Sequence, residues 1–86
     1  MKKNKSLKVS IVMGSQSDYK IMHLAEKTLN KIGVPFETKI ISAHRTPKRM
    51  YDYALATKRN NIGVIIAGAG GSAHLPGMIS ALTSLP

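Results

Sequence analysis

Residues 9–18 read VSIVMGSQSD, and this stretch determines the class of fold. Its first five residues form an apolar, largely β-branched run with a single serine, which is typical of a strand buried on both faces in a parallel sheet. Gly14 ends the run, and a polar loop follows in which Ser17 or Asp18 can cap a helix. We therefore predict a strand, a loop and the start of a helix in direct succession.

The residues that follow complete a first helix and begin a second strand. Apolar side chains recur at helical spacing up to residue 32, and Gly33 directly after them predicts the end of that helix. Val34 and Pro35 favour an extended backbone, and residues 36–41 are predicted to form the second strand. The order strand, loop, helix, strand indicates a crossover connection between parallel strands.

The same order of elements continues through the rest of the chain. Pro47 occupies a position favoured at the start of a helix, and that helix is predicted to fade at residues 60–61. Residues 62–67 form a third apolar run, which we interpret as a buried strand. Pro76 is predicted to begin a short third helix that extends to about Leu82.

Three successive strand-helix units predict an α/β fold, a three-layer αβα sandwich with a parallel sheet. The sequence halts at residues 84–86, directly after a helix and where another strand is expected. A strand as apolar as residues 62–67 is poorly suited to an open sheet edge. We therefore expect a domain truncated after about three strand-helix units, preceded by a flexible basic arm at residues 1–6.

Composition restricts the classes of partner. Thirteen Lys and Arg against four Asp and Glu give a net charge of +9, which fits a nucleic acid or a small anionic substrate. The basic residues are dispersed, and one Phe with three Tyr offers little surface for base stacking, so we expect no nucleic-acid partner. The absence of cysteine favours a reducing cytoplasm, and no apolar run approaches the roughly 20 residues that span a bilayer. We expect a cytoplasmic protein with no membrane partner.

Three polar loops follow the carboxyl ends of the predicted strands, at residues 14–18, 42–46 and 68–74. Ligands of open α/β sheets bind at that edge, so the loops predict one shared site. The first loop can bind an anion such as phosphate through backbone N–H groups and hydroxyls, and the Asp18 carboxylate suits ribose hydroxyls. Capping of the first helix by Ser17 or Asp18 is the alternative role for this loop.

The second loop places His44 beside Arg45. Imidazole is the side chain that both gives and takes a proton near neutral pH, and guanidinium offers a planar pair of donors to phosphate oxygens. A surface or capping role is the alternative for such a histidine. Two histidines and one loop carboxylate, without close ligand spacing, do not predict a metal site.

The third loop contains Gly68, Gly70 and Gly71, whose missing Cβ atoms let the backbone approach a flat ligand. The loop formally fits a dinucleotide-binding pattern, but it follows the third strand instead of the first, which makes that match weak. His74 adds a second imidazole, for which a hydrogen bond to nearby backbone is an equally good interpretation.

Taken together, residues 14–18 (GSQSD), 42–47 (SAHRTP) and 67–78 (AGAGGSAHLPGM) resemble, in order and spacing, the signature loops of the class I 5-(carboxyamino)imidazole ribonucleotide mutase family. The resemblance extends from about Leu7 to Pro86, the N-terminal half of a family member. It implies a flavodoxin-like subunit of a homo-octamer that uses neither metal nor organic cofactor, with residues 7–86 forming the N-terminal part of a single mutase domain.

The resemblance also implies a reaction and its residues. The reaction is an isomerisation of de novo purine biosynthesis, in which 5-(carboxyamino)imidazole ribonucleotide becomes 4-carboxy-5-aminoimidazole ribonucleotide by decarboxylation and recarboxylation. His44 corresponds to the general acid and base, and His74 to a second imidazole near the migrating carboxylate. Ser17, Ser42 and Arg45 correspond to ligands of the nucleotide's phosphate. Asp18 corresponds to the ligand of the ribose. The residues that correspond to the imidazole pocket are Ser15, Gly70, Gly71 and Leu75.

Four alternatives stay open at the level of sequence. The class II aminoimidazole ribonucleotide carboxylases share the fold, but they typically have Lys-Gly-Pro where this chain has Arg45, Thr46 and Pro47. A nucleotide-binding or flavin-binding module without catalysis, a basic nucleic-acid-binding protein and an inactive fragment are the other three.

Overall fold

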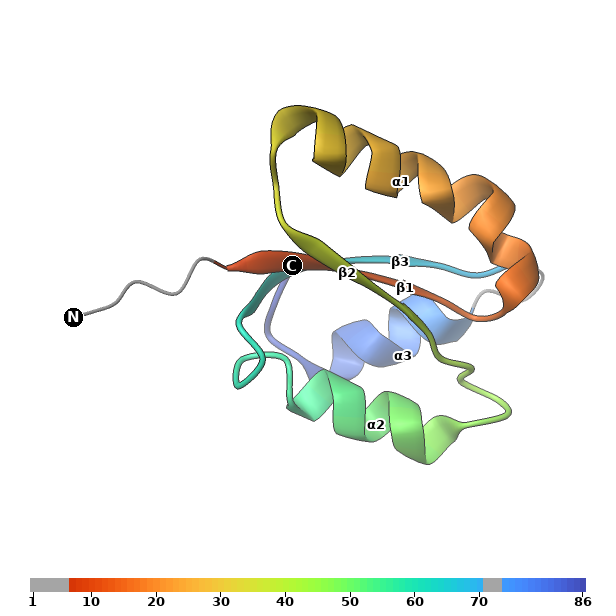
Figure 1. Cartoon of the computed structure of the whole chain (residues 1–86). Helices are drawn as coiled ribbons and strands as arrows, with labels where there is room; N and C mark the ends of the chain where they lie inside the picture. The colour runs from red at the N-terminus through yellow and green to blue at the C-terminus, as the bar shows by residue number, and fades with distance from the viewer. Residues whose placement is uncertain (1–6, 71–73) are drawn as a thin grey trace.

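The computed structural model describes residues 7–70 and 74–86, so the expected basic arm at residues 1–6 lies outside the described residues. The elements follow one another as strand, helix, strand, helix, strand and helix (Figure 1). No helix in the described part of the chain is long and apolar enough to cross a membrane. The bounds of the elements are β1 Lys8–Met13, the 3₁₀ turn η1 Gln16–Asp18, α1 Tyr19–Ile32, β2 Phe36–Ile40, α2 Pro47–Leu55, β3 Ile62–Gly68 and α3 His74–Leu82.

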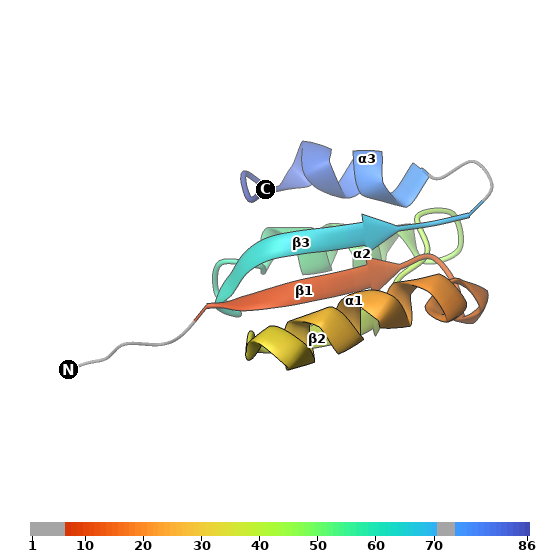
Figure 2. The same cartoon turned by 90° about the horizontal axis from the view of Figure 1, so that it is seen from above.

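The three strands form one parallel sheet in the order β2-β1-β3, as the alternation of elements predicts. Val9 of β1 lies opposite Phe36 of β2 and Val64 of β3, so all three strands start at the same edge. Figure 2 shows β1 and β3 side by side, with both arrows toward the edge at which their following loops begin. The predicted α/β fold, flavodoxin-like in its order of elements, is confirmed.

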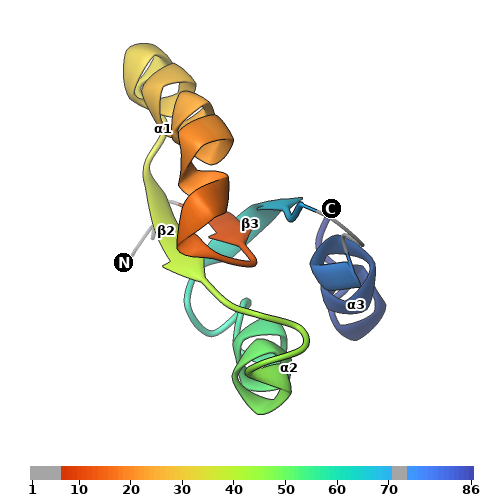
Figure 3. The same cartoon turned by 90° about the vertical axis from the view of Figure 1, so that its right-hand side faces the viewer.

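Helices cover both faces of the sheet and give it two small cores. Helix α1 lies on one face, and α2 and α3 lie on the other (Figure 3). Under α1, Ile11 and Met13 pack with Leu29, whereas Val12 packs on the other face in a cluster with Ile41 and α2 and α3 side chains. Ser10 to Met13 are fully buried, which confirms β1 as a strand covered on both sides.

Helix α1 ends where the sequence predicts. Gly33 has φ 77°, a left-handed conformation that glycine adopts without a Cβ clash. In that conformation the Val34 amide donates to the Leu29 carbonyl at 2.9 Å, which satisfies one of the unpaired carbonyls of the last turn. The chain then enters β2 in an extended conformation.

Two helix boundaries differ from the prediction. Helix α2 ends at Leu55 instead of fading at residues 60–61, and the residues after it form hydrogen-bonded turns in which the buried Thr57 hydroxyl donates to the Ala54 carbonyl at 3.0 Å. Turns then lead into β3, with Asn61 at φ 61°, a conformation that asparagine tolerates. Helix α3 begins at His74, before Pro76, because the first turn of a helix needs no internal N–H donor.

The prediction that residues 62–67 are a buried strand is wrong for one face of β3. Ile62 is buried, but Val64 and Ile66 are 41% and 36% exposed. β3 is an edge strand in this sheet, and α1 packs over β1 and β2. The alternate residues of β3 that face α2 and α3, Ile65 and Ala67, pack against the core.

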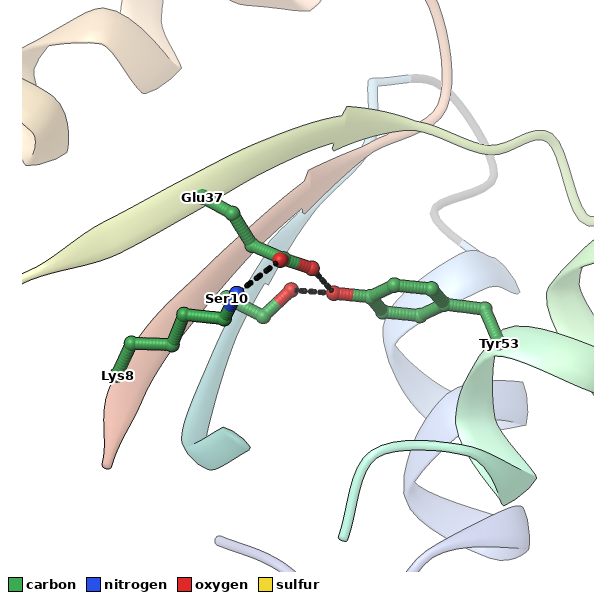
Figure 4. Close-up of polar contacts among 4 residues, drawn as sticks. All are labelled: Lys8, Ser10, Glu37 and Tyr53. Atoms are coloured by element: carbon green, nitrogen blue, oxygen red, sulfur yellow. Dashed lines mark hydrogen bonds and ion pairs between the residues drawn. The ribbon is translucent and has the colours of Figure 1, made fainter. Parts of the chain in front are cut away.

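A polar cluster joins the amino-terminal ends of β1 and β2 to α2 (Figure 4). Tyr53 donates its hydroxyl proton to the Glu37 carboxylate and accepts a hydrogen bond from the fully buried Ser10 hydroxyl. Lys8 forms an ion pair with the same carboxylate at 2.9 Å. The cluster satisfies a buried hydroxyl and a half-buried tyrosine that would otherwise lose their hydrogen bonds with water.

The surroundings of Glu37 favour its charged form. Burial opposes ionisation, but the Tyr53 hydrogen bond and the ammonium groups of Lys8 and Lys39 outweigh burial and lower the pKa of Glu37. Burial and the hydrogen bond to Glu37 together raise the pKa of Tyr53 well above its ordinary value. The cluster therefore holds an ionised carboxylate against a neutral phenol.

Glu37→Gln should lower the free energy of unfolding at pH 7 by about 1–3 kcal/mol, because Lys8 and Tyr53 lose a charged acceptor. Folding lowers the pKa of Glu37, so its ionised form stabilises the fold above the unfolded pKa of about 4.3. That contribution disappears as the pH falls through the folded pKa. Urea unfolding of wild type and variant from pH 7 to pH 3 should therefore show two curves that converge on the acid side.

The matched control is Asp52→Asn, which removes the exposed ion pair between Lys48 and Asp52. Exposed pairs of this kind contribute little to stability, because solvent screens their charges. An equal loss in both variants, or a loss for Glu37→Gln that does not change with pH, would contradict the role given to the cluster.

Candidate functional site

The loops after β1, β2 and β3 meet at one edge of the sheet and enclose a cleft of about 510 Å³. Nine of the ten residues predicted for the site line this cleft, and the tenth, Gly71, lies outside the described residues. The lining residues are Gly14, Ser15, Ser17, Asp18, Ser42, Ala43, His44, Arg45, Ala69, Gly70, His74 and Leu75.

Two imidazoles contact each other in the cleft. The Nε2 atom of His44 lies 2.8 Å from the Nδ1 atom of His74, with ring centroids 4.8 Å apart and ring planes at 54°. One of the two nitrogens must donate a proton and the other must accept it, so the contact requires that at least one ring is neutral. The loop after β2 and the start of α3 thus form a pair that can hold and pass a proton.

Asp18 connects the first loop to the third. Its Oδ2 atom accepts hydrogen bonds from the Ser15 amide at 3.1 Å and the Ser15 hydroxyl at 3.4 Å, and its Oδ1 atom accepts one from the Gly70 amide at 3.2 Å. The predicted cap of α1 by a side chain is therefore not formed by Asp18, whose carboxylate points back to Ser15 and across to Gly70. The carboxylate thus links the first loop to the third through one hydrogen bond.

Hydrogen bonds within the second loop hold its backbone at Arg45. The Ser42 hydroxyl accepts from the Arg45 amide at 2.9 Å, and the Thr46 amide donates to the Ser42 carbonyl at 3.0 Å. Thr46 also accepts from the Ser42 amide through its own hydroxyl at 3.1 Å. Because Ser42 accepts through its hydroxyl oxygen, its hydroxyl proton stays able to donate to an anion in the cleft.

The glycines and Leu75 differ in what they offer to a ligand. A Cβ on Gly68 would lie 2.4 Å from the sulfur of Met22, so the missing side chain of Gly68 makes room for α1 instead of a ligand. Gly70 lines the cleft and is exposed. Leu75 is 2% exposed and belongs to the core cluster, so it contributes only a small apolar edge to the cleft.

Sequence reasoning missed Arg49, which lies in the first turn of α2. A second hollow of about 480 Å³ adjoins the cleft and shares Ser17, Ser42 and Arg45 with it, and Arg49 lines this hollow but not the cleft. The sequence feature that could have indicated Arg49 is its position four residues after Arg45, with the start of a predicted helix between them. In residues 7–70 and 74–86, no three His, Cys, Asp or Glu side chains converge as metal ligands.

Comparison with known proteins finds one matching family model and several similar proteins. The model of a family described as AIR carboxylase matches residues 8–86. The N5-carboxyaminoimidazole ribonucleotide mutase of Vibrio parahaemolyticus is 59% identical over 80 residues, which are 93% of this chain and 50% of that protein. The mutase of the same name from Pyrococcus horikoshii is 57% identical over 86 residues, 100% of this chain and 48% of that protein.

A third relative is the bifunctional purine synthesis protein purC/E of Dictyostelium discoideum. It is 60% identical over 78 residues, which are 91% of this chain and 8% of that protein. The chain spans about half the length of the curated mutases it matches.

Asp18→Ala should loosen the contact between the first and third loops. Without the carboxylate, the Gly70 amide loses its acceptor, and its hydrogen exchange should become at least about tenfold faster, as expected for a hydrogen bond to a charged group. Amide exchange followed by NMR measures this directly. Ser17→Ala is the control, since the Ser17 hydroxyl contacts Ser15 within its own loop. An unchanged exchange rate of the Gly70 amide in Asp18→Ala would show that its hydrogen bond to Asp18 does not stabilise the third loop.

Proposed function

The chain belongs to the AIR carboxylase family, and from this membership we propose that its cleft binds an aminoimidazole ribonucleotide. We propose further that the domain isomerises 5-(carboxyamino)imidazole ribonucleotide to 4-carboxy-5-aminoimidazole ribonucleotide in purine biosynthesis. The names of the mutase relatives support the reaction. The observation that carries the proposal is the His44–His74 pair in one cleft with Arg45.

The proposed position of the nucleotide follows from the chemistry of the lining residues. Arg45 and the hydroxyls of Ser17 and Ser42 provide cationic and neutral donors for the 5′-phosphate at the border of the cleft. Asp18 can accept a hydrogen bond from a ribose hydroxyl, because its Oδ1 atom accepts only from the Gly70 amide and has capacity for a second donor. The imidazole then lies toward the two histidines, against Ser15, Gly70, Gly71 and Leu75.

His44 performs both proton transfers in the proposed mechanism. As the bond between the exocyclic nitrogen and the carboxyl carbon breaks, the electron pair stays on nitrogen, which takes a proton from the imidazolium of His44, and carbon dioxide is released. The ring carbon then attacks carbon dioxide, and neutral His44 removes the proton from that carbon. The histidine returns to its starting state, so the net reaction is an isomerisation without a cofactor.

His74 has two roles in this proposal. Its hydrogen bond to Nε2 of His44 restricts the orientation of that ring. It also places a second nitrogen donor near the migrating carboxylate, where it can retain carbon dioxide between the two steps. Exclusion of water matters here because carbon dioxide would otherwise leave the site.

The proposal includes the setting of the domain. Residues 7–86 form the N-terminal part of a single mutase domain, as the coverage of about half of the mutase relatives suggests. The subunit assembles into a homo-oligomer, an octamer by analogy with the family, and works in the cytoplasm.

A class II carboxylase is the second candidate, because the matching family model is described as AIR carboxylase. Such an enzyme adds carbon dioxide to aminoimidazole ribonucleotide directly. Turnover of 5-(carboxyamino)imidazole ribonucleotide without added bicarbonate distinguishes the mutase. Product formed only from aminoimidazole ribonucleotide with bicarbonate would establish the carboxylase instead.

The chain should bind 5-aminoimidazole ribonucleotide at least about tenfold more tightly than flavin mononucleotide, a difference of about 1.4 kcal/mol. Both ligands carry a 5′-phosphate, but the flavin has an open ribityl chain and a three-ring system in place of the ribose and the single imidazole for which the lining residues are proposed. Isothermal titration calorimetry with each ligand tests this. Tighter binding of the flavin would replace the proposal with a flavin-binding module.

His44→Asn should reduce isomerisation at least about 100-fold, since the variant lacks the group that moves the proton. Nucleotide affinity should change less than about threefold, because Asn preserves a polar side chain and the phosphate contacts are elsewhere. His23→Asn is the matched control, as His23 lies on α1 outside the cleft. Near-normal turnover of His44→Asn would remove His44 from the mechanism, and binding without turnover in the wild-type chain would limit the proposal to binding.

A further inference from the structure

We propose that Arg49 is a second guanidinium for the 5′-phosphate of the nucleotide and sets the preference of the site for a dianionic phosphate. This inference rests on the proposed function for the identity of the nucleotide. Arg49 lies four residues after Arg45, at the third position of α2, whereas Arg45 lies in the loop before that helix. Neither the sequence motifs nor the resemblance gives Arg49 a role.

The position of Arg49 relative to the cleft is the first observation. The cleft and the adjoining hollow share one border, formed by Gly14, Ser15, Ser17, Ser42 and Arg45. The two histidines line only the cleft, and Arg49 lines only the hollow. A phosphate held at the shared border by Arg45 therefore has the proton-transfer pair on one side and Arg49 on the other.

The use of the carboxylates is the second observation. The chain has four Asp and Glu residues, and each has other partners. Asp18 accepts from Ser15 and Gly70, Glu26 from Tyr19 and Thr38, Glu37 from Tyr53, and Asp52 pairs with Lys48. In the part of the chain that the structure describes, no carboxylate lies within 4.0 Å of either guanidinium that borders the hollow. The positive charge of the border is therefore not neutralised by a carboxylate of the described residues.

The charge of the ligand is the third consideration. A phosphate monoester carries a charge of about −1.5 to −2 at pH 7, and one guanidinium offsets only about half of it. Two guanidiniums with planar donor pairs match both the charge and the several oxygens of the group. Lys48 is not a substitute, because its ammonium is bound to Asp52 at 2.9 Å and it lines neither the cleft nor the hollow.

Arg49→Gln tests the inference, with Lys48→Gln as the matched control that removes one charge from the same helical turn. The ligands are 5-aminoimidazole ribonucleotide, its unphosphorylated riboside and inorganic phosphate, measured by isothermal titration calorimetry and, for phosphate, by phosphorus NMR. Arg49→Gln should weaken binding of the nucleotide and of phosphate at least about tenfold, as expected for loss of a charge-assisted hydrogen bond. Riboside affinity should stay within about twofold.

Lys48→Gln should change every affinity less than about twofold, because Lys48 acts on the ligand only through the general field. Arg49→Lys should recover part of the affinity for phosphate, since it keeps the charge and loses the planar donor pair. Equal weakening by Arg49→Gln and Lys48→Gln, or an equal loss for nucleotide and riboside, would overturn the inference.

The inorganic phosphate titration separates this inference from the proposed function. A wild-type chain that binds phosphate through Arg49 but does not bind aminoimidazole ribonucleotide would contradict the proposed nucleotide and leave the phosphate role of Arg49 supported. A chain that binds the nucleotide with no loss of affinity in Arg49→Gln would support the proposed nucleotide and contradict the phosphate role of Arg49. A chain that binds neither ligand would overturn both.

Discussion

The parallel pairing of β1 with β2 on one side and β3 on the other is the constraint on which the structure depends. Parallel strands leave the sheet at the same edge, so each must be followed by a loop and a helix that returns the chain to the opposite edge. The buried segment from Ser10 to Met13 holds the helices on both faces at once. The convergence of three loops is therefore a consequence of the topology and does not need interactions between the loops themselves.

Most of this arrangement could be predicted from the sequence, because the signals are local and strong. The apolar run of β1, the stop at Gly33 and the helix start at Pro47 each follow from a few adjacent residues. The errors fall where tertiary contacts decide. Just after α2, the buried Thr57 hydroxyl contacts the Thr83 hydroxyl, 26 residues away in the chain, and Val64 is exposed in a sheet whose α1 side chains pack on β1 and β2.

The candidate site could be predicted as a set of residues but not as a set of contacts. Its members share three short motifs, and topology alone brings these together. The bond from Gly70 to Asp18 joins residues 52 apart in the chain, and the contact of His44 with His74 joins residues 30 apart. No pattern within one loop shows which atoms meet across two. The sequence suggested that Gly68 lacks a side chain to make room for a ligand, but in the structure the Met22 side chain occupies that space.

The positions of the four carboxylates help to explain which kind of anionic partner the net charge of +9 favours. A composition this basic is compatible with a nucleic acid or a small anion, and sequence alone favours the small anion only through the dispersal of lysines. In the fold, Glu37 is ionised at the amino-terminal ends of the strands, where it stabilises the packing of α2 on the sheet. The one carboxylate at the opposite edge, Asp18, has its two oxygens bound to the Ser15 and Gly70 amides. Because each of the four carboxylates has partners elsewhere, the guanidiniums beside the cleft have no counter-charge in the described chain, which supports the proposed binding of a compact anion at that border.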